Sequence, residues 1–208
     1  MWTSTFSSSD GEPSPEDMRM WSAPENEIPV ALPLNTVLAR TDDVAVALLH
    51  LSVYTTGIAL ELVVRMRPAV ATAQNHDLNG LLWGDGPGGG RFLLGVELAD
   101  GRRATGLGPP GSGDAVVVFT QGGGSGGQAS VQQSWWLHPL PPEGPLRFVV
   151  RCPELGIEET SVVLDGGAIR RAADDVLVLW PWAPPPEQAR TEPPGPPDLP
   201  ADSWFAQE

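Results

Sequence analysis

Apolar and polar positions between Ile28 and Trp182 follow the short rhythm of β-strands. Runs rich in Val, Leu, Ile and aromatic residues are broken by Gly, Pro, Asn or Asp roughly every 10 residues. This spacing shows no regular alternation of strands with helices, so it predicts an all-β, two-layer β-sandwich rather than a parallel α/β sheet. We expect an immunoglobulin-like strand order, with jelly-roll and barrel-like orders as the alternatives.

Two neighbouring runs predict a long hairpin. Val44 to Val53 is apolar at nearly every position, which is typical of a strand covered on both faces or of one in the centre of the sandwich. After a turn at Thr55 to Gly57, Leu60 to Met66 alternates apolar with charged residues, which predicts one wet face. Asp100-Gly101 lies between two further extended runs and predicts a second hairpin.

Other segments predict the connections and the end of the domain. The stretch from Pro68 to Gly90 is polar, and Gln121 to Gln128 is so rich in glycine that we expect a flexible loop. Asp165 is a suitable N-cap for one short helix near the C-terminal end of the domain. The run VLVLW then predicts a closing strand, with Trp180 and Trp182 packed on one face.

Both ends of the chain have the composition of disordered segments. Residues 1–27 carry six acids and one Arg, and residues 183–208 carry five acids, one Arg and several proline runs. Such segments hold too few apolar groups to offset an ordering entropy of about 1 to 2 kcal/mol per residue. We therefore expect a sandwich at residues 28–182 between two acidic tails, with Trp204 and Phe205 as candidate binding residues at the tip of the C-terminal one.

The charge pattern excludes some partners. The net charge is −14, and all basic residues are Arg, scattered without the basic stripe that phosphate binding requires. Nucleic acid and anionic membranes are therefore poor partners. No run approaches the roughly 18 apolar residues of a membrane span, and the N-terminus lacks the features of a secretory signal. Cys152 is the single cysteine, so we expect a soluble, cytoplasmic protein without disulfides.

No set of residues has the spacing of an active site, a cofactor site or a metal site. His50 lies in the most apolar strand and is expected in the core; His76 lies in a polar loop. Gly84, Gly86 and Gly89 match a dinucleotide fingerprint but lack the strand before them and the helix after them. Gly123, Ser125 and Gly127 match the pattern of a nucleophile elbow, but they lie in a glycine tract and not in the strained strand-to-helix turn that this motif requires. We expect no catalytic residues, no cofactor and no metal.

The aromatic residues are the only lead to a binding site. Adjacent residues of a strand point to opposite faces, so one of Trp135 and Trp136 is expected in the core and the other on the outer face. An exposed Trp can anchor a partner or a sugar, and His138 at the end of the same strand can form the rim of such a site. Simple packing of these aromatics is the alternative.

Several strings of this chain resemble a recurrent set of uncharacterised actinobacterial proteins. They are FLLGVELADGRRATG, SWWLHPLPPEGPLRFVVRCPELGIEETSVVLDGGAI and VLVLWPW, and they fall within about residues 28–182. Those proteins share a strand, a proline-rich connection, an apolar strand, a "CP-LGI-ET" turn, and a closing helix and strand. The resemblance implies the limits of the domain and carries no activity, cofactor or catalytic residue.

Three hypotheses of function follow. The first is a non-catalytic sandwich that binds another protein, with its acidic tails as flexible arms. The second is a sandwich that binds a small molecule or glycan through Trp135 or Trp136 and the long loops. The third is a hydrolytic enzyme in which a histidine meets an acid only in the folded chain. The sequence favours the first and does not identify the partner or the oligomeric state.

Overall fold

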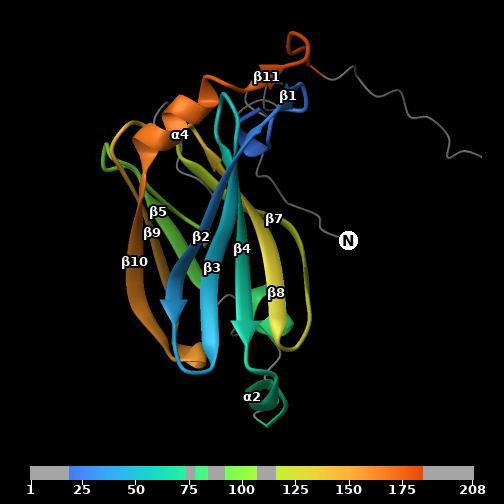
Figure 1. The fold of residues 1–208 in the computed structure, drawn as a ribbon, viewed down its shortest axis with the longest axis vertical. Helices are drawn as coiled ribbons and strands as arrows, with labels where there is room; N and C mark the ends of the chain where they lie inside the picture. Colours follow the sequence, from blue (N-terminus) through green and yellow to red (C-terminus); the bar gives the residue numbers. More distant parts are fainter. Residues whose placement is uncertain (1–18, 74–77, 84–91, 107–115, 185–208) are drawn as a thin grey trace, which may run out of the picture.

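The structure is a computed structural model that describes residues 19–73, 78–83, 92–106 and 116–184 (Figure 1). Two antiparallel sheets make up the body of these residues. The five-stranded sheet has the order β2-β3-β4-β8-β7 and the four-stranded sheet has the order β10-β9-β5-β6. The bounds of the five-stranded sheet are β2 (Val30–Arg40), β3 (Val44–Val53), β4 (Ile58–Met66), β8 (Ser130–His138) and β7 (Val118–Gly126). Those of the other sheet are β10 (Ile157–Asp165), β9 (Pro145–Cys152), β5 (Leu93–Glu97) and β6 (Arg103–Thr105).

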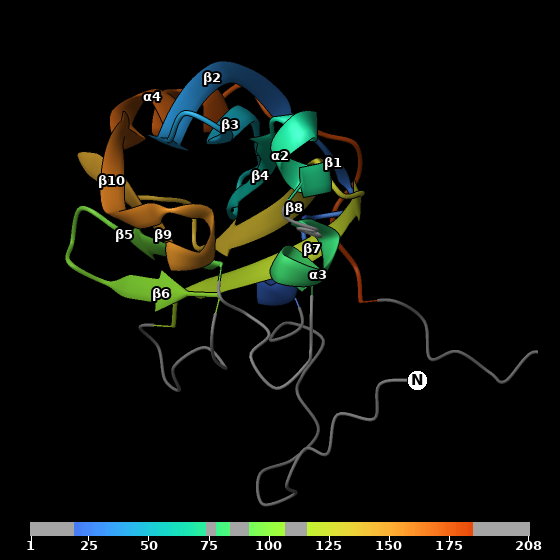
Figure 2. The same cartoon turned by 90° about the horizontal axis from the view of Figure 1, so that it is seen from below.

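The predicted all-β sandwich is confirmed. Seen from below, the two sheets curve around one interior, and the edge strand β10 lies beside β2 while β6 lies beside β7 (Figure 2). Along each strand, alternate residues point into this interior, because successive side chains of a strand face opposite sides. The Asp100-Gly101 hairpin is also confirmed: Gly101 has a φ of 85°, which glycine adopts without strain, in the turn that joins β5 to β6.

The core joins the two sheets through aromatic side chains. Phe119 of β7 stacks on Trp135 of β8 with ring centroids 4.8 Å apart. The same Phe119 ring lies 6.4 Å from the ring of Phe148, which belongs to β9 of the opposite sheet. Around them, the inward residues of β3 and β4 are almost wholly buried, and together they form a single hydrophobic cluster.

The strand β3 lies inside the five-stranded sheet, between β2 and β4, and it is not covered on both faces. Only one of its faces enters the core: Val46, Leu48, Leu51 and Val53 are fully buried, whereas the residues between them are half-buried. Ala45, Ala47 and Leu49 are half-buried rather than covered by a second layer, so the apolar character of these positions does not reflect burial on both faces.

The helices include two that the sequence did not predict. The predicted helix is present as α4 (Gly166–Ala173), and its N-cap Asp165 accepts a hydrogen bond from the Gly167 amide at 2.8 Å. The polar connection after β4 contains α2 (Pro68–Ala73) and α3 (Leu78–Trp83). Leu78 and Leu82 are buried, so apolar residues within a mostly polar segment were sufficient for α3 to pack on β8.

The glycine tract is not a loop, contrary to the prediction. Val118–Gly126 forms β7, which pairs with β8 at the edge of the five-stranded sheet. A Cβ at Gly124 would collide with the Gln132 carbonyl oxygen and with the Trp83 ring of α3. The glycines therefore allow a close approach of neighbouring chain segments, which is the role glycine has in strands that lie under another element.

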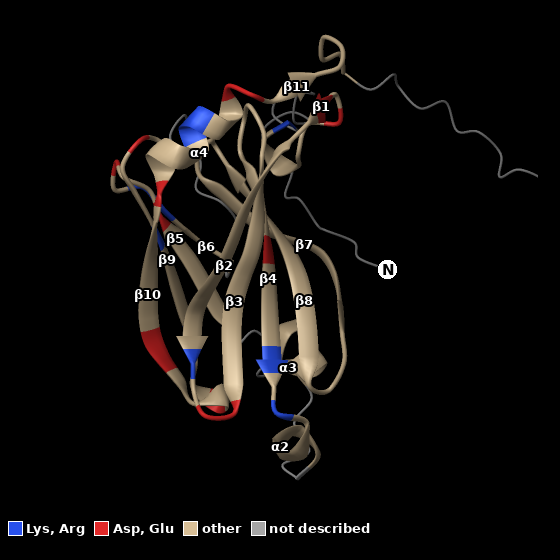
Figure 3. Ribbon diagram, in the orientation of Figure 1, with Lys and Arg blue, Asp and Glu red and all other residues tan. Residues whose placement is uncertain are grey.

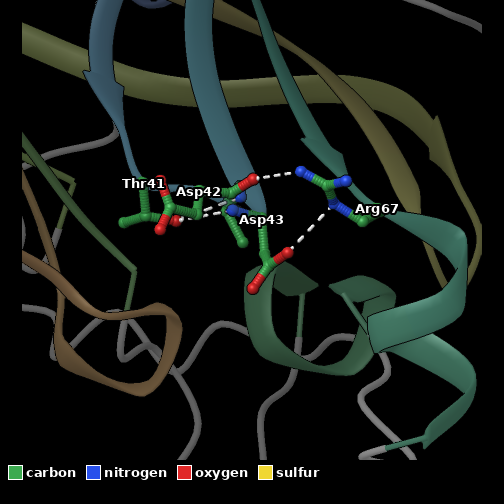
Figure 4. A network of polar contacts seen from close by, with 5 residues as sticks. Thr41, Asp42, Asp43 and Arg67 are labelled. Carbon is green, nitrogen blue, oxygen red and sulfur yellow. Dashed lines mark hydrogen bonds and ion pairs between the residues drawn. The ribbon is translucent and has the colours of Figure 1, made fainter.

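A polar network holds the lower end of the sandwich (Figure 4). In the turn between β2 and β3, the Thr41 hydroxyl accepts hydrogen bonds from the amides of Asp43 and Val44 at 3.3 and 3.0 Å. Arg67, just after β4, reaches the Asp43 carboxylate at 3.0 Å and the Asp42 carbonyl oxygen at 2.8 Å. Arg67 therefore ties the end of β4 to the turn between β2 and β3, through the Asp43 carboxylate and the Asp42 backbone.

Replacing Phe148 tests the core. Phe148→Ala should lower the free energy of unfolding by about 3 to 5 kcal/mol, because it removes the ring that meets Phe119 across the sheets and leaves a cavity. Val163→Ala is the matched control: Val163 lies on the neighbouring strand β10 but is 53% exposed, so its loss should be below about 1 kcal/mol. Urea denaturation measures both, and equal losses would contradict the packing described.

Candidate functional site

The run VLVLW lies outside the sandwich, contrary to the prediction of a closing strand. After α4 the chain crosses the end of the molecule, where β11 (Leu177–Val178) pairs with β1 (Glu27–Ile28) in a two-stranded ribbon (Figure 1). The backbone is held closely: the Leu179 amide donates to the Asn26 carbonyl oxygen at 2.9 Å, and the Asn26 side-chain amide donates to the Trp180 carbonyl oxygen at 2.8 Å. The sandwich core is complete without this run.

The side chains of the ribbon are exposed although they are large and apolar. We name this group the ribbon surface; it consists of Ile28, Leu177, Val178, Leu179 and Trp180, which are between 42% and 58% exposed. Single exposed apolar residues are common, but five large ones within two paired segments are unusual and are typical of a region that binds a partner. The prediction that Trp180 is packed is therefore wrong. Trp182 does make a contact, because the Arg19 guanidinium lies 4.5 Å from its ring centroid.

Buried polar groups anchor the ribbon to the sandwich. Glu27 is 8% exposed, and its carboxylate accepts hydrogen bonds from both the amide and the hydroxyl of Thr55 in the turn between β3 and β4. Tyr54 is next to this turn; burial and then the Glu27 charge raise the pKa of its phenol above the ordinary value of 10.0. The ordered domain therefore begins before residue 28, and residues 19–27 of the predicted disordered tail are part of it.

The two adjacent tryptophans both lie inside the protein. Trp135 is 5% exposed and belongs to the core, as expected for one of the pair. Trp136 points to the outer face but is only 6% exposed, because η1 (Arg19–Trp21) covers it and its indole N–H donates to the Met20 carbonyl oxygen at 2.8 Å. Neither is an exposed binding platform, so the N-terminal segment occupies the place where the sequence suggested a ligand.

His138 ends β8 below the same end of the molecule. Burial lowers the pKa of its imidazole, and the nearby charges of Arg102 and Arg19 act in the same direction, against a backbone hydrogen bond with Thr56. Its Nδ1 atom is buried and has no hydrogen-bond partner among the described residues. The other predicted binding residues, Trp204 and Phe205, lie outside the described residues.

His50 is not in the core. The register of β3 shifts at Leu48/His50, and this irregularity turns His50 to the outer face. There its Nε2 atom lies 3.4 Å from the Glu61 carboxylate, which also accepts a hydrogen bond from Gln132. Ser134 of β8 lies opposite Glu61 in the register, and its hydroxyl donates a hydrogen bond to the Gly123 carbonyl oxygen at 2.9 Å. His76 lies outside the described residues.

The remaining candidate chemistry is structural. Cys152 is fully buried, and burial raises the pKa of its thiol, which disfavours the reactive thiolate. Within the described ranges, no three His, Cys, Asp or Glu residues gather as a metal site would require. None of the helices in those ranges combines the length and apolar character needed to cross a bilayer.

Acidic residues border the ribbon surface. Asp174 and Asp175, at the end of α4, precede the apolar run directly, and Glu25 precedes β1; all three are exposed. Figure 3 shows acidic positions on the segment between α4 and β11 and near β1, while most of the outer face of β2 and β3 carries no charge. The sequence did not predict the ribbon surface, because VLVLW matches the pattern of a buried strand. Only its pairing with β1 places it outside the sandwich.

Comparisons with known proteins give no assignment. No protein-family model matches the chain, and neither the curated proteins nor the solved structures contain a significant match. The resemblance to actinobacterial proteins therefore stays a prediction.

The single tyrosine provides a test of the ribbon anchor. Spectrophotometric titration should show Tyr54 ionising above pH 10, and Glu27→Gln should lower that pKa, because it removes the negative charge that opposes the phenolate. Since the folded state favours the neutral phenol, its contribution to stability is present below pH 10 and is lost as the pH rises through the raised pKa. Glu25→Gln, an exposed neighbour, is the control and should leave the titration unchanged.

Proposed function

We propose that this chain is a non-catalytic β-sandwich module that binds another protein through the ribbon surface. The observation that carries the proposal is the exposure of five large apolar side chains on a ribbon whose backbone is firmly held. Burial of a side chain of this size is worth about 1.5 to 3 kcal/mol, and exposing several together is costly unless a partner covers them. A fixed backbone also limits the entropy lost on binding.

The surroundings of the ribbon define the chemistry of the partner. The apolar centre with acidic neighbours at Glu25, Asp174 and Asp175 matches the apolar core and polar rim of protein interfaces. The net charge of −14 adds a long-range attraction for basic groups. The partner is therefore a protein with an apolar patch bordered by basic residues, and its association rate should fall as salt rises.

The strand order supports the finer class, an immunoglobulin-like sandwich. If β3 to β10 are lettered A, B, C, C′, D, E, F and G, one sheet reads A-B-E-D and the other reads G-F-C-C′, which is the immunoglobulin arrangement with β2 added at one edge. Sandwiches of this architecture are frequent in recognition. A lone, buried cysteine favours a reducing compartment, so we place the protein in the cytoplasm.

Photo-cross-linking tests the proposal directly. The photoreactive residue benzoylphenylalanine is placed at Val178 in the ribbon surface, or at Val163 on β10, in the full chain in its own cells. These two valines are 50% and 53% exposed, so they differ in location rather than accessibility. Position 178 should give a discrete cross-linked product of higher mass, and position 163 should not.

Variants extend this test to affinity. Leu177→Ser combined with Trp180→Ser should reduce capture of the cross-linked partner at least about tenfold, because central apolar anchors dominate the energy of interfaces. Val37→Ser, at another half-exposed valine, is the control and should not change it. Equal cross-linking from positions 178 and 163, or capture that the double variant does not alter, would overturn the proposal.

A further inference from the structure

The outer face of the four-stranded sheet contains a trough between two lines of larger side chains. On β5, Leu93, Gly95 and Glu97 point outward; the first pairs with Arg151, the second with Val149 and Thr105, and the third with Arg147 and Arg103. The middle row is low at Gly95, which has no side chain and lies between Val149 and Thr105. The row that contains Leu93 and the row that contains Glu97 are four residues apart along β5, which corresponds to roughly 13 Å.

Arginines form the walls of this trough. On one side, Glu97 lies between Arg103 at 3.0 Å and Arg147 at 3.9 Å, so a single carboxylate faces two guanidinium groups. On the other side, Arg151 makes no hydrogen bond or ion pair with any residue that the structure describes. With Glu159 also at the rim, three arginines face two acids, which gives a local charge of +1 in a chain of −14.

The floor of the trough is apolar. Its volume is about 350 Å³, and Leu93, Val149 and the backbone at Gly95 contribute to its lining. This volume lies in the range of about 300 to 1,000 Å³ that is typical of sites for small molecules. An open guanidinium can bind a carboxylate through two parallel hydrogen bonds.

We propose that this trough is a binding site for a small organic monocarboxylate with an apolar body. The carboxylate pairs with Arg151, and the body lies across Gly95 against Val149 and Leu93. A local charge of +1 suits one negative charge better than two, because Glu97 and Glu159 repel a second. The site is on a different face from the ribbon surface, so it is independent of protein binding there.

Two probe molecules separate the charge from the apolar body. 4-Phenylbutyrate carries both features, whereas 4-phenylbutanamide has nearly the same shape without the charge. Isothermal titration of the full chain should give an affinity for the acid at least about tenfold higher than for the amide, which corresponds to about 1.4 kcal/mol. Equal affinities, or no binding of the acid, would overturn the proposal.

Two variants locate the site. Arg151→Gln should weaken binding of 4-phenylbutyrate about tenfold or more by removing the guanidinium. Gly95→Leu should block the trough without disturbing the fold, since a Cβ at Gly95 meets its nearest neighbours, Ala104 and Thr105, at 3.6 Å. Arg170→Gln on the exposed surface of α4 is the control and should bind as the natural chain does, within about twofold.

The thermal unfolding midpoint of each variant shows whether the fold is intact. If Arg151→Gln and Gly95→Leu stay folded and bind the acid as well as the natural chain, the acid binds elsewhere and the proposal fails. Loss of binding in Arg170→Gln to the same degree would also contradict it, because the effect would then reflect the overall charge.

Discussion

The contact between the two sheets through Phe119, Trp135 and Phe148 is the interaction on which the rest of the structure depends. One cysteine cannot form an internal disulfide, and the described residues contain no metal-like cluster, so this core carries the fold. Because side chains alternate along each strand, the strands of the two large sheets give one face to the core and leave the other outside. The two proposed sites are the ribbon surface and the trough on the four-stranded sheet. Both consist of residues that lie outside the core.

The ribbon surface consists of large apolar residues that lie outside the core. The core closes without Val176 to Trp180. Asn26 holds the two segments of the ribbon together through Trp180, and the buried Glu27 carboxylate, which accepts two hydrogen bonds from Thr55, holds the ribbon against the sandwich. The same N-terminal segment covers Trp136, which otherwise would be an exposed aromatic on the outer face. Residues 19–28 thus cover the outer side of Trp136 and also help to hold the ribbon surface in place. This arrangement favours a rigid interface over a flexible arm.

The sequence predicted the class of fold and most strands, because alternation and turn residues are local signals that survive without long-range information. Apart from the missed helices α2 and α3, its main errors depend on contacts between distant segments. The Gly122–Gly126 tract is a strand only because β8 and Trp83 lie beside it; His50 is outside because of a register shift; and VLVLW is exposed because it pairs with β1. The arginine trough was missed for the same reason, since Arg103, Arg147 and Arg151 come together only across three strands.

The stability of a variant with Leu177→Ser and Trp180→Ser, measured by urea denaturation, tests the central claim most directly: that these apolar residues lie outside the core and are free for a partner. Exposed substitutions usually change stability by less than about 0.5 kcal/mol each, so the pair should cost no more than about 1 kcal/mol. A loss of several kcal/mol, as expected when large core residues are truncated, would show that the run is part of the core and would contradict the account.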